Sequence, residues 1–166
     1  MITQERLKEL LSYNETTGLF TRKVTAGSAK AGSIAGFKCK DGYFRLWIDN
    51  KRYSNHWLAW FYVNAAWPSD ELDHIDGDRC NNRIKNLRES NRIENSRNRG
   101  KPISNSSGAK GVTWNKSVGK WQAQIGFNQT TMYLGCFETI KDASCAYEKK
   151  ALELHGAFYR PNTFGE

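Results

Sequence analysis

The stretch that decides the fold reads Glu71-Leu72-Asp73-His74-Ile75-Asp76-Gly77-Asp78, and Asn86-Leu87-Arg88 and Ile93-Glu94-Asn95 follow it. Residues 72–75 are typical of a short strand, residues 76–78 of a turn, and residues 86–88 of a strand that returns. Ser90 or Asn91 can cap a helix that runs to Asn98, and Glu94 is favourably placed in its first turn. The sequence therefore predicts a hairpin followed by a helix.

This hairpin carries residue types that suit metal-assisted hydrolysis of a phosphodiester. Hard divalent cations prefer oxygen ligands, which Asp73 and Asn95 can supply. His74 can take a proton from water near neutral pH, and an amide oxygen of Asn86 could hold its other ring nitrogen. Asp73 and His74 point to opposite faces of a regular strand, so joint action requires a bend there. From the residues alone, an Asp-His pair in a loop is more often a solvated surface pair than a catalyst.

The N-terminal part of the chain, residues 1–70, predicts a mixed α/β segment. Leu7, Leu10 and Leu11 recur at helical spacing behind Thr3, which suits the N-cap of a short helix. A strand is expected at residues 19–21. Further strands at 43–48 and 51–53 flank Asp49-Asn50, a typical hairpin turn. Residues 55–63 are apolar nearly all round and predict a buried helix, which Trp67-Pro68 ends.

The C-terminal part of the chain predicts a separate small domain. A polar linker is expected at residues 100–108, where Gly, Ser, Asn and Pro are concentrated. Strands are expected at 111–114, 120–127 and 131–137. In the second of these strands, polar and apolar residues alternate, which places them on opposite faces. A helix then begins behind Thr139 and stops at Gly156, so the pattern predicts three strands with one helix across them.

Composition limits the class of protein. The chain holds 25 Lys and Arg against 17 Asp and Glu, a net charge of +8, which favours a polyanionic partner. No apolar run reaches the roughly 18 residues that a membrane-spanning helix needs, and Glu5 and Arg6 argue against a secretory signal. The four cysteines lack the spacing of a zinc site. We therefore expect reduced thiols, no zinc, no membrane association and a cytoplasmic location.

Residues 72–98 resemble the motif of the HNH nucleases, in the variant whose third position is Asn. The matching residues are Asp73, His74, Asn86 and Asn95. The spacing of the two asparagines from the histidine is similar to that of the phage homing-endonuclease branch. The segments upstream of the motif are similar too, notably those at 13–18, 42–43, 56–60 and 67–68.

Residues 108–158 resemble an APETALA2-type DNA-binding domain. The residues that carry the likeness are Gly111-Val112, Gly119-Lys120-Trp121, Tyr133-Leu134-Gly135, Phe137, Ala143, Ala146-Tyr147, Ala151 and Gly156. The arginines that read bases in the plant proteins are replaced here by Thr113, Gln122, Thr131 and their neighbours. The resemblance therefore implies DNA binding but leaves strong sequence specificity in doubt.

Together the two resemblances imply an α+β chain. Residues 1–99 would form a nuclease domain, with an α/β segment at 1–70 and a ββα-metal core at 71–99. Residues 100–108 would be a linker, and residues 109–166 would form a small three-stranded antiparallel sheet packed on one helix. The chain would be a Mg²⁺- or Mn²⁺-dependent endonuclease that acts on double-stranded DNA as a monomer or homodimer. Cleavage would nick or cut the duplex, leaving 5′-phosphate and 3′-hydroxyl ends.

The HNH resemblance also implies a role for each motif residue. Asp73 and Asn95 would bind the metal, His74 would activate water and Asn86 would orient His74. Phosphate contacts are expected from Arg79, Arg83, Arg88 and Arg97. Contacts from the exposed sheet of the last domain are expected from Lys110, Thr113, Asn115, Lys116, Lys120, Gln122, Gln124, Thr131 and Tyr133.

Other interpretations stay open at this point. A DNA-binding regulator with a vestigial nuclease fold would keep the same basic charge, although the intact motif argues against it. An RNA-binding protein is a third possibility, but aromatic-rich RNA motifs are absent. His56 could reach the active site, but a satisfied, half-buried histidine is the more frequent outcome for such a residue.

Overall fold

The computed structural model describes residues 1–98, 100–101 and 105–161. The chain divides into two compact units, Met1–Asn95 and Ser96–Glu166, and each is described here by itself. Among the described residues, no helix has both the length and the apolar character needed to cross a membrane.

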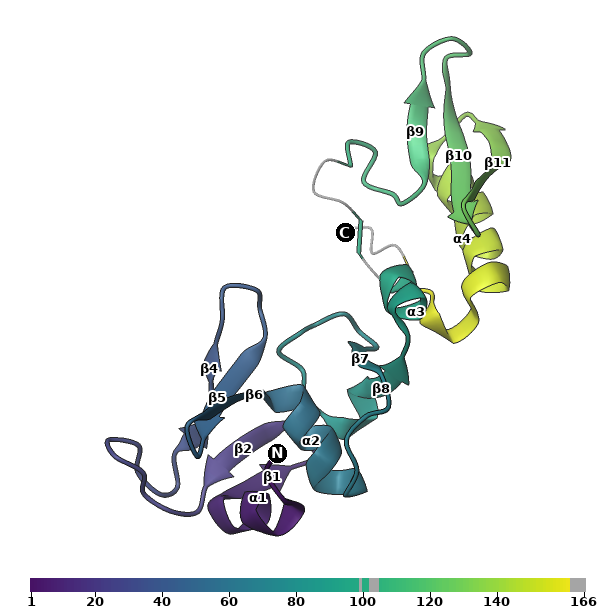
Figure 1. Cartoon of the computed structure of the whole chain (residues 1–166). Helices are drawn as coiled ribbons and strands as arrows, with labels where there is room; N and C mark the ends of the chain where they lie inside the picture. Colours follow the sequence, from purple (N-terminus) through teal and green to yellow (C-terminus); the bar gives the residue numbers. More distant parts are fainter. Residues whose placement is uncertain (99, 102–104, 162–166) are drawn as a thin grey trace. The chain divides into compact units, whose positions relative to one another are not determined.

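The first unit opens with a helix and a small sheet (Figure 1). Helix α1 (Gln4–Leu10) begins behind Thr3, whose hydroxyl accepts a hydrogen bond from Arg6 N at 3.2 Å. Strand β1 (Leu11–Asn14) pairs antiparallel with β2 (Leu19–Arg22), which pairs with β3 (Ile34–Ala35). Leu11 thus begins a strand and does not extend the helix, but its side chain is still buried in the core.

A second sheet and a buried helix complete the core of this unit. Strands β4 (Phe37–Lys38), β5 (Phe44–Ile48) and β6 (Lys51–Ser54) form the sheet. The β5–β6 turn has positive φ at both Asp49 and Asn50, which is the turn that the sequence predicts. Helix α2 (Asn55–Asn64) follows directly and ends at Ala65, before Trp67-Pro68. The core consists chiefly of Leu7, Phe20, Leu46, Ile48, Leu58 and Phe61.

The predicted hairpin and helix are present at residues 71–97. Strand β7 (Glu71–His74) pairs antiparallel with β8 (Leu87–Ser90), which follows a 3₁₀ turn, η1 (Ile84–Asn86). Helix α3 (Arg92–Arg97) comes next. Its start is a capping box: Asn91 Oδ1 accepts from Ile93 N and Glu94 N, and Glu94 Oε2 accepts from Asn91 N.

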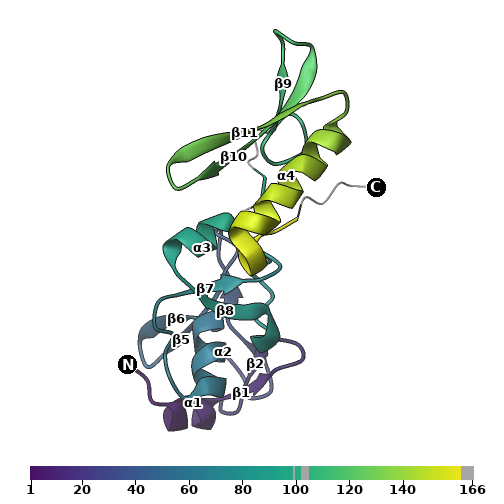
Figure 2. The ribbon, with the colours of Figure 1, turned by 90° about the vertical axis from the view of Figure 1, so that its right-hand side faces the viewer.

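The second unit has the predicted sheet and helix. Strands β9 (Val112–Asn115), β10 (Lys120–Phe127) and β11 (Thr130–Phe137) form an antiparallel sheet with β10 in the centre. Figure 2 shows helix α4 (Ile140–His155) lying along one side of this sheet, followed by a 3₁₀ turn, η2 (Gly156–Phe158). The apolar residues of β10 pack toward α4, as the alternation predicts, with Ala123 and Ile125 fully buried.

The boundary between the units differs from the expected linker at 100–108. The division falls between Asn95 and Ser96, inside α3. Ser107 Oγ donates to Val112 O at 2.7 Å and Asn105 Nδ2 to Ala109 O at 2.8 Å, so these residues are part of the second unit. Residues 102–104 of the expected linker lie outside the described residues.

Candidate functional site

His74 ends strand β7 and is buried, with 4% of its surface exposed. Its Nε2 lies 3.1 Å from Oδ1 of Asn82, which is itself buried. Because an amide oxygen can only accept, Nε2 carries the hydrogen in the neutral ring and the lone pair lies on Nδ1. The arrangement fixes both the orientation of the ring and its tautomer, as a general base requires.

In this structure the side chain of Asn86 forms hydrogen bonds within its own loop and none to His74, which differs from the expected arrangement. Its Nδ2 donates to Asp76 Oδ1 at 2.9 Å and to Asn81 O at 2.8 Å, and its Oδ1 accepts from Asp76 N. The 3₁₀ turn η1 directs this side chain into the loop that follows β7, which it ties together. Asn82, which lies in that loop, is the residue within hydrogen-bond distance of His74 Nε2. Sequence reasoning missed it because a loop residue has no periodicity that predicts its direction.

Two aromatic side chains from other elements surround His74. The ring of His56, at the start of α2, lies 5.0 Å from that of His74, and the ring of Tyr43 lies 5.9 Å from it. His56 is 6% exposed, and burial, with smaller contributions from His74 and Arg45, lowers its pKa to about 3. His56 is therefore neutral at physiological pH. The sequence offered His56 as a minor alternative, and it placed Tyr43 only in an upstream segment that is similar to those of HNH nucleases.

Asp73 is 5% exposed and forms an ion pair with its cross-strand partner Arg88. Asp73 Oδ2 accepts from Arg88 Nε at 2.9 Å and from Nη2 at 2.6 Å. Arg88, from which a phosphate contact is expected, thus has a carboxylate partner in this structure. The pairing of β7 with β8 keeps a regular register through His74, the last residue of β7.

Asn95 projects from α3 toward the hairpin. Its Nδ2 donates to Glu71 Oε2 at 2.7 Å, and Glu71 lies two residues before Asp73 on the same face of β7. The side chains of Asp73, Glu71 and Asn95 can each offer an oxygen atom as a metal ligand. Mg²⁺ commonly binds through one or two carboxylates, keeping waters and taking substrate phosphate oxygens. The oxygen atoms of Asp73 and Asn95 are of the type that this mode of binding uses. The described residues contain no group of three His, Cys, Asp or Glu that could hold a metal ion.

The open face of the β9–β11 sheet and its turns carry most of the residues predicted to contact DNA. Thr113, Lys116, Thr131 and Tyr133 are exposed. Asn115 Nδ2 donates to Gln122 Oε1 at 2.8 Å, and Gln122 Nε2 donates to Gln124 Oε1 at 3.1 Å. Polar side chains of β9 and β10 therefore form a connected row. Lys120 is paired with Glu138 at 2.8 Å.

Lys110 is not on this face, contrary to prediction. It is 9% exposed, its Nζ donates to Arg160 O at 2.8 Å, and it lies over the ring of Tyr159. Burial, and to a smaller extent Arg160, lowers its pKa. The reason is its position: Lys110 precedes Gly111 and β9, where the chain turns along the end of the core.

The other predicted phosphate contacts differ in their surroundings. Arg79 is exposed; its Nη1 donates to Asp41 O at 2.8 Å and its guanidinium lies 4.9 Å from the ring centre of Tyr43. Arg83 is exposed on the same loop. Arg97 is half-buried, with its guanidinium over the ring of Phe127 in the second unit. Arg79 thus contacts Tyr43, whose ring lies near that of His74.

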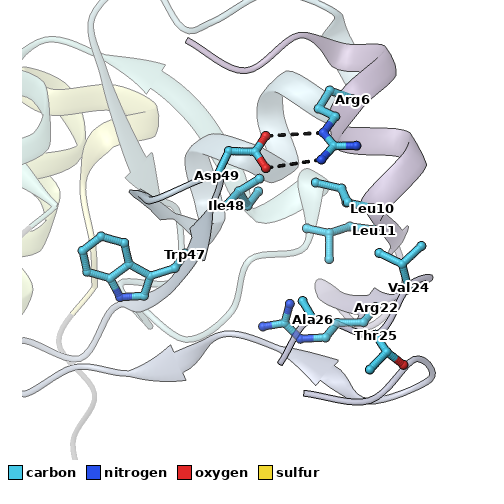
Figure 3. A pocket seen from close by; sticks show the side chains of 10 residues that line it. All are labelled: Arg6, Leu10, Leu11, Arg22, Val24, Thr25, Ala26, Trp47, Ile48 and Asp49. Carbon is cyan, nitrogen blue, oxygen red and sulfur yellow. Dashed lines mark hydrogen bonds and ion pairs between the residues drawn. The ribbon is translucent and has the colours of Figure 1, made fainter. Parts of the chain in front are cut away.

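A cavity of about 390 Å³ lies elsewhere in the first unit, between α1, β2 and the β5–β6 hairpin (Figure 3). Trp47, Leu10 and Val24 contribute apolar walls, and Asp49 is paired with Arg6 at one side. None of the predicted site residues lines it.

Comparison with known proteins finds similarity over the segment that contains His74. A family described as HNH endonuclease matches residues 53–97, which include His56, the hairpin and α3. Protein 3.8 of Escherichia phage T7 is 32% identical over 106 residues, which are 63% of this chain and 87% of that protein. No solved structure matches the chain.

Proposed function

Because the chain belongs to the same family as the phage T7 protein and carries an HNH endonuclease domain, we propose that it is a metal-dependent DNA endonuclease of the homing-endonuclease type. Strands β7 and β8 and helix α3 would form the ββα-metal core. The single observation that carries this proposal is the state of His74. It is buried, and its Nε2 lies 3.1 Å from Asn82 Oδ1, which favours the tautomer with the lone pair on Nδ1.

In the proposed reaction, His74 Nδ1 takes the proton from the water that attacks the scissile phosphate. Asn82 keeps the ring in the required tautomer as the proton arrives and helps to stabilise the imidazolium. Asp73 and Asn95 supply oxygen ligands. A bound Mg²⁺ or Mn²⁺ would supply Lewis-acid stabilisation of the phosphate and of the leaving 3′ oxygen. The products would be a 5′-phosphate and a 3′-hydroxyl, and one such site would cut one strand at a time.

The second unit would be the DNA-binding module, of the APETALA2 type. Support comes from the open face of β9–β11, where exposed Lys116 and Tyr133 flank the row of amides. An antiparallel strand pair can enter the major groove of DNA, where Gln reads adenine and Lys reads guanine or phosphate. Arg79 and Arg83 would contact phosphates beside the cleavage site.

Supercoiled plasmid provides the test. The full chain is incubated with plasmid and Mg²⁺, with and without excess chelator, beside the variant His74→Ala. We expect a nicked product that needs the cation. Loss of the general base should lower the rate by about 10²–10⁴-fold while binding of an uncut duplex is retained. A His74→Ala protein that nicks at the parental rate would remove His74 from the mechanism.

One observation favours a second candidate, a DNA-binding regulator without catalysis. The carboxylate of Asp73, which would hold the cation, is already paired with Arg88. Under this alternative the parent protein binds duplex DNA and leaves plasmid intact at every Mg²⁺ or Mn²⁺ concentration. The same assay therefore separates the two candidates.

A further inference from the structure

The side-chain amide of Asn95 has two chemically different ends, and only one of them can bind a cation. Oδ1 is a ligand, whereas Nδ2 presents hydrogens that a cation repels. The terminal torsion of an asparagine side chain is broad and roughly two-fold, so rotation by half a turn exchanges the two ends at little cost. A metal site that uses this amide therefore gains from a neighbour that holds it one way round.

Glu71 is placed to do this. Its Oε2 accepts a hydrogen bond from Asn95 Nδ2 at 2.7 Å, a length typical of a charge-assisted bond. A carboxylate only accepts, so it selects the nitrogen end and turns Oδ1 away from itself. Glu71 is half-buried, and β7 holds its backbone opposite Ser90, so the acceptor sits on a rigid element.

The same bond also changes the ligand electronically. A negatively charged acceptor on the N–H side polarises the amide and increases the negative charge on its oxygen. In metalloproteins, partners that orient a ligand in this way contribute strongly to metal affinity. Arg88 has a comparable position toward Asp73, where it occupies Oδ2 of the carboxylate.

We propose that Glu71 is a positioning residue for the cation site: through its hydrogen bond with Asn95 Nδ2, it fixes Oδ1 of that amide as the end offered to the ion. This inference rests on the proposed function, in which Asn95 binds the metal. It assigns to Glu71 a role through Asn95 and not a bond to the ion.

Titration of the full-length protein with Mn²⁺ alone, followed by electron paramagnetic resonance of the unbound ion, tests the inference. The variants are Glu71→Ala, Glu71→Gln, Asn95→Ala and the double variant. Glu71→Ala should weaken Mn²⁺ binding by about 10–100-fold. Glu71→Gln should lose clearly less, because its amide oxygen can still accept from Asn95 Nδ2. Once Asn95 is alanine, Glu71→Ala should have no further effect.

The matched control is Glu89→Gln. Glu89 lies on β8 of the same hairpin, but its carboxylate binds Ser69 N and Oγ. The substitution Glu89→Gln removes this charge and should leave Mn²⁺ binding unchanged. Thermal unfolding of each variant identifies any that fail to fold, and Glu71→Gln, which keeps the size of the side chain, remains informative if Glu71→Ala does not.

The outcomes separate this inference from the proposed function. A parent protein that binds no Mn²⁺ and does not nick plasmid would overturn both. A parent that binds Mn²⁺ while Glu71→Ala binds it equally well would overturn the role of Glu71 alone. Equal losses in Glu71→Gln and Glu71→Ala, persisting in the Asn95→Ala background, would make Glu71 a ligand and overturn the positioning role.

Discussion

The two units of the chain place their polar residues in opposite ways. In the first unit, His56, Asp73 and His74 are almost fully buried, and each one contacts a hydrogen-bonding, ion-pair or aromatic partner. In the second unit, the amides lie on the open face of a sheet and Lys116 is exposed in the turn between β9 and β10, while small apolar residues such as Ala123 and Ala143 fill the core.

This difference matches two kinds of chemistry. A general base works best with a fixed ring in a site of low dielectric, so burial is useful despite its cost. Contacts with a polyanion need charges and donors at the surface, where phosphates can reach them. We therefore expect substitutions in the first unit to change rates or stability, and substitutions on the open sheet to change DNA affinity and its salt dependence.

The largest expected effect comes from a substitution that should unfold the second unit and leave the first unit folded. Gly111 has a φ of +65°, and a Cβ at this position would overlap the ring of Tyr147 and the carbonyl of Gln124. Gly111→Ala should destabilise the second unit by about 3 kcal/mol or more, because backbone strain and overpacking add. Two-dimensional NMR should show loss of the β9–β11 resonances with those of α2 and β7 retained.

Gly119→Ala is the control, since a Cβ there meets no atom within 4 Å. Equal damage from both substitutions would rule out the packing argument.

Within the first unit, two asparagines near His74 should differ in their effects. Asn82→Ala removes the acceptor at His74 Nε2, so the ring can rotate or change tautomer, and the nicking rate should fall by up to about 10²-fold. Asn86→Ala loosens the loop that holds Asp76 and Asn81 and should cost about 1 kcal/mol of stability with a smaller loss of rate. Single-turnover nicking and urea unfolding measure the two quantities. A slower Asn86→Ala enzyme with unchanged stability would return the orienting role to Asn86.

The buried histidine of the first unit should make that unit sensitive to acid. The pKa of His56 is about 3 in the folded chain and 6.5 when unfolded, so the unfolded state binds the extra proton between these values. Stability is then complete above pH 6.5 and falls as the pH drops toward 3, by about 2 kcal/mol at pH 5. Hydrogen exchange of the α2 amides at pH 7 and pH 5 measures it, after correction for intrinsic rates.

Two variants sharpen this prediction. His56→Phe should remove most of the difference between pH 7 and pH 5, whatever its effect on stability at pH 7. His155 in the second unit also has a lowered pKa, caused mainly by burial, but it is much less buried. His155→Gln should therefore leave the response of α2 unchanged. A response that persists in His56→Phe would assign the acid sensitivity to other groups.

The sequence predicted the elements better than it predicted the contacts around the site. Strand β10 matches residues 120–127, and the caps at Thr139 and Gly156 match α4, because alternation and capping are local properties of the chain. The role of Asn82 and the burial of Lys110 depend on how loops fold back, which no period encodes. Tyr43 and His56 reach His74 through the tertiary packing of elements that lie far from β7 in the sequence.

The smallest expected effects concern the lysines of the second unit, and they test whether its open face meets phosphate. Each phosphate contact contributes about 0.9 to the slope of log affinity against log salt concentration. Lys116 is exposed, so Lys116→Ala should reduce that slope by about this amount on every duplex. Lys120 is already paired with Glu138, so Lys120→Ala should reduce the slope less.

Lys110→Met is the control. Lys110 Nζ binds Arg160 O inside the unit, so this substitution should leave the slope unchanged. Gel-shift titrations of the full chain in chelator, over a series of salt concentrations, decide among these. A slope that changes with Lys110 but not with Lys116 would mean that the open sheet is not the surface that binds DNA.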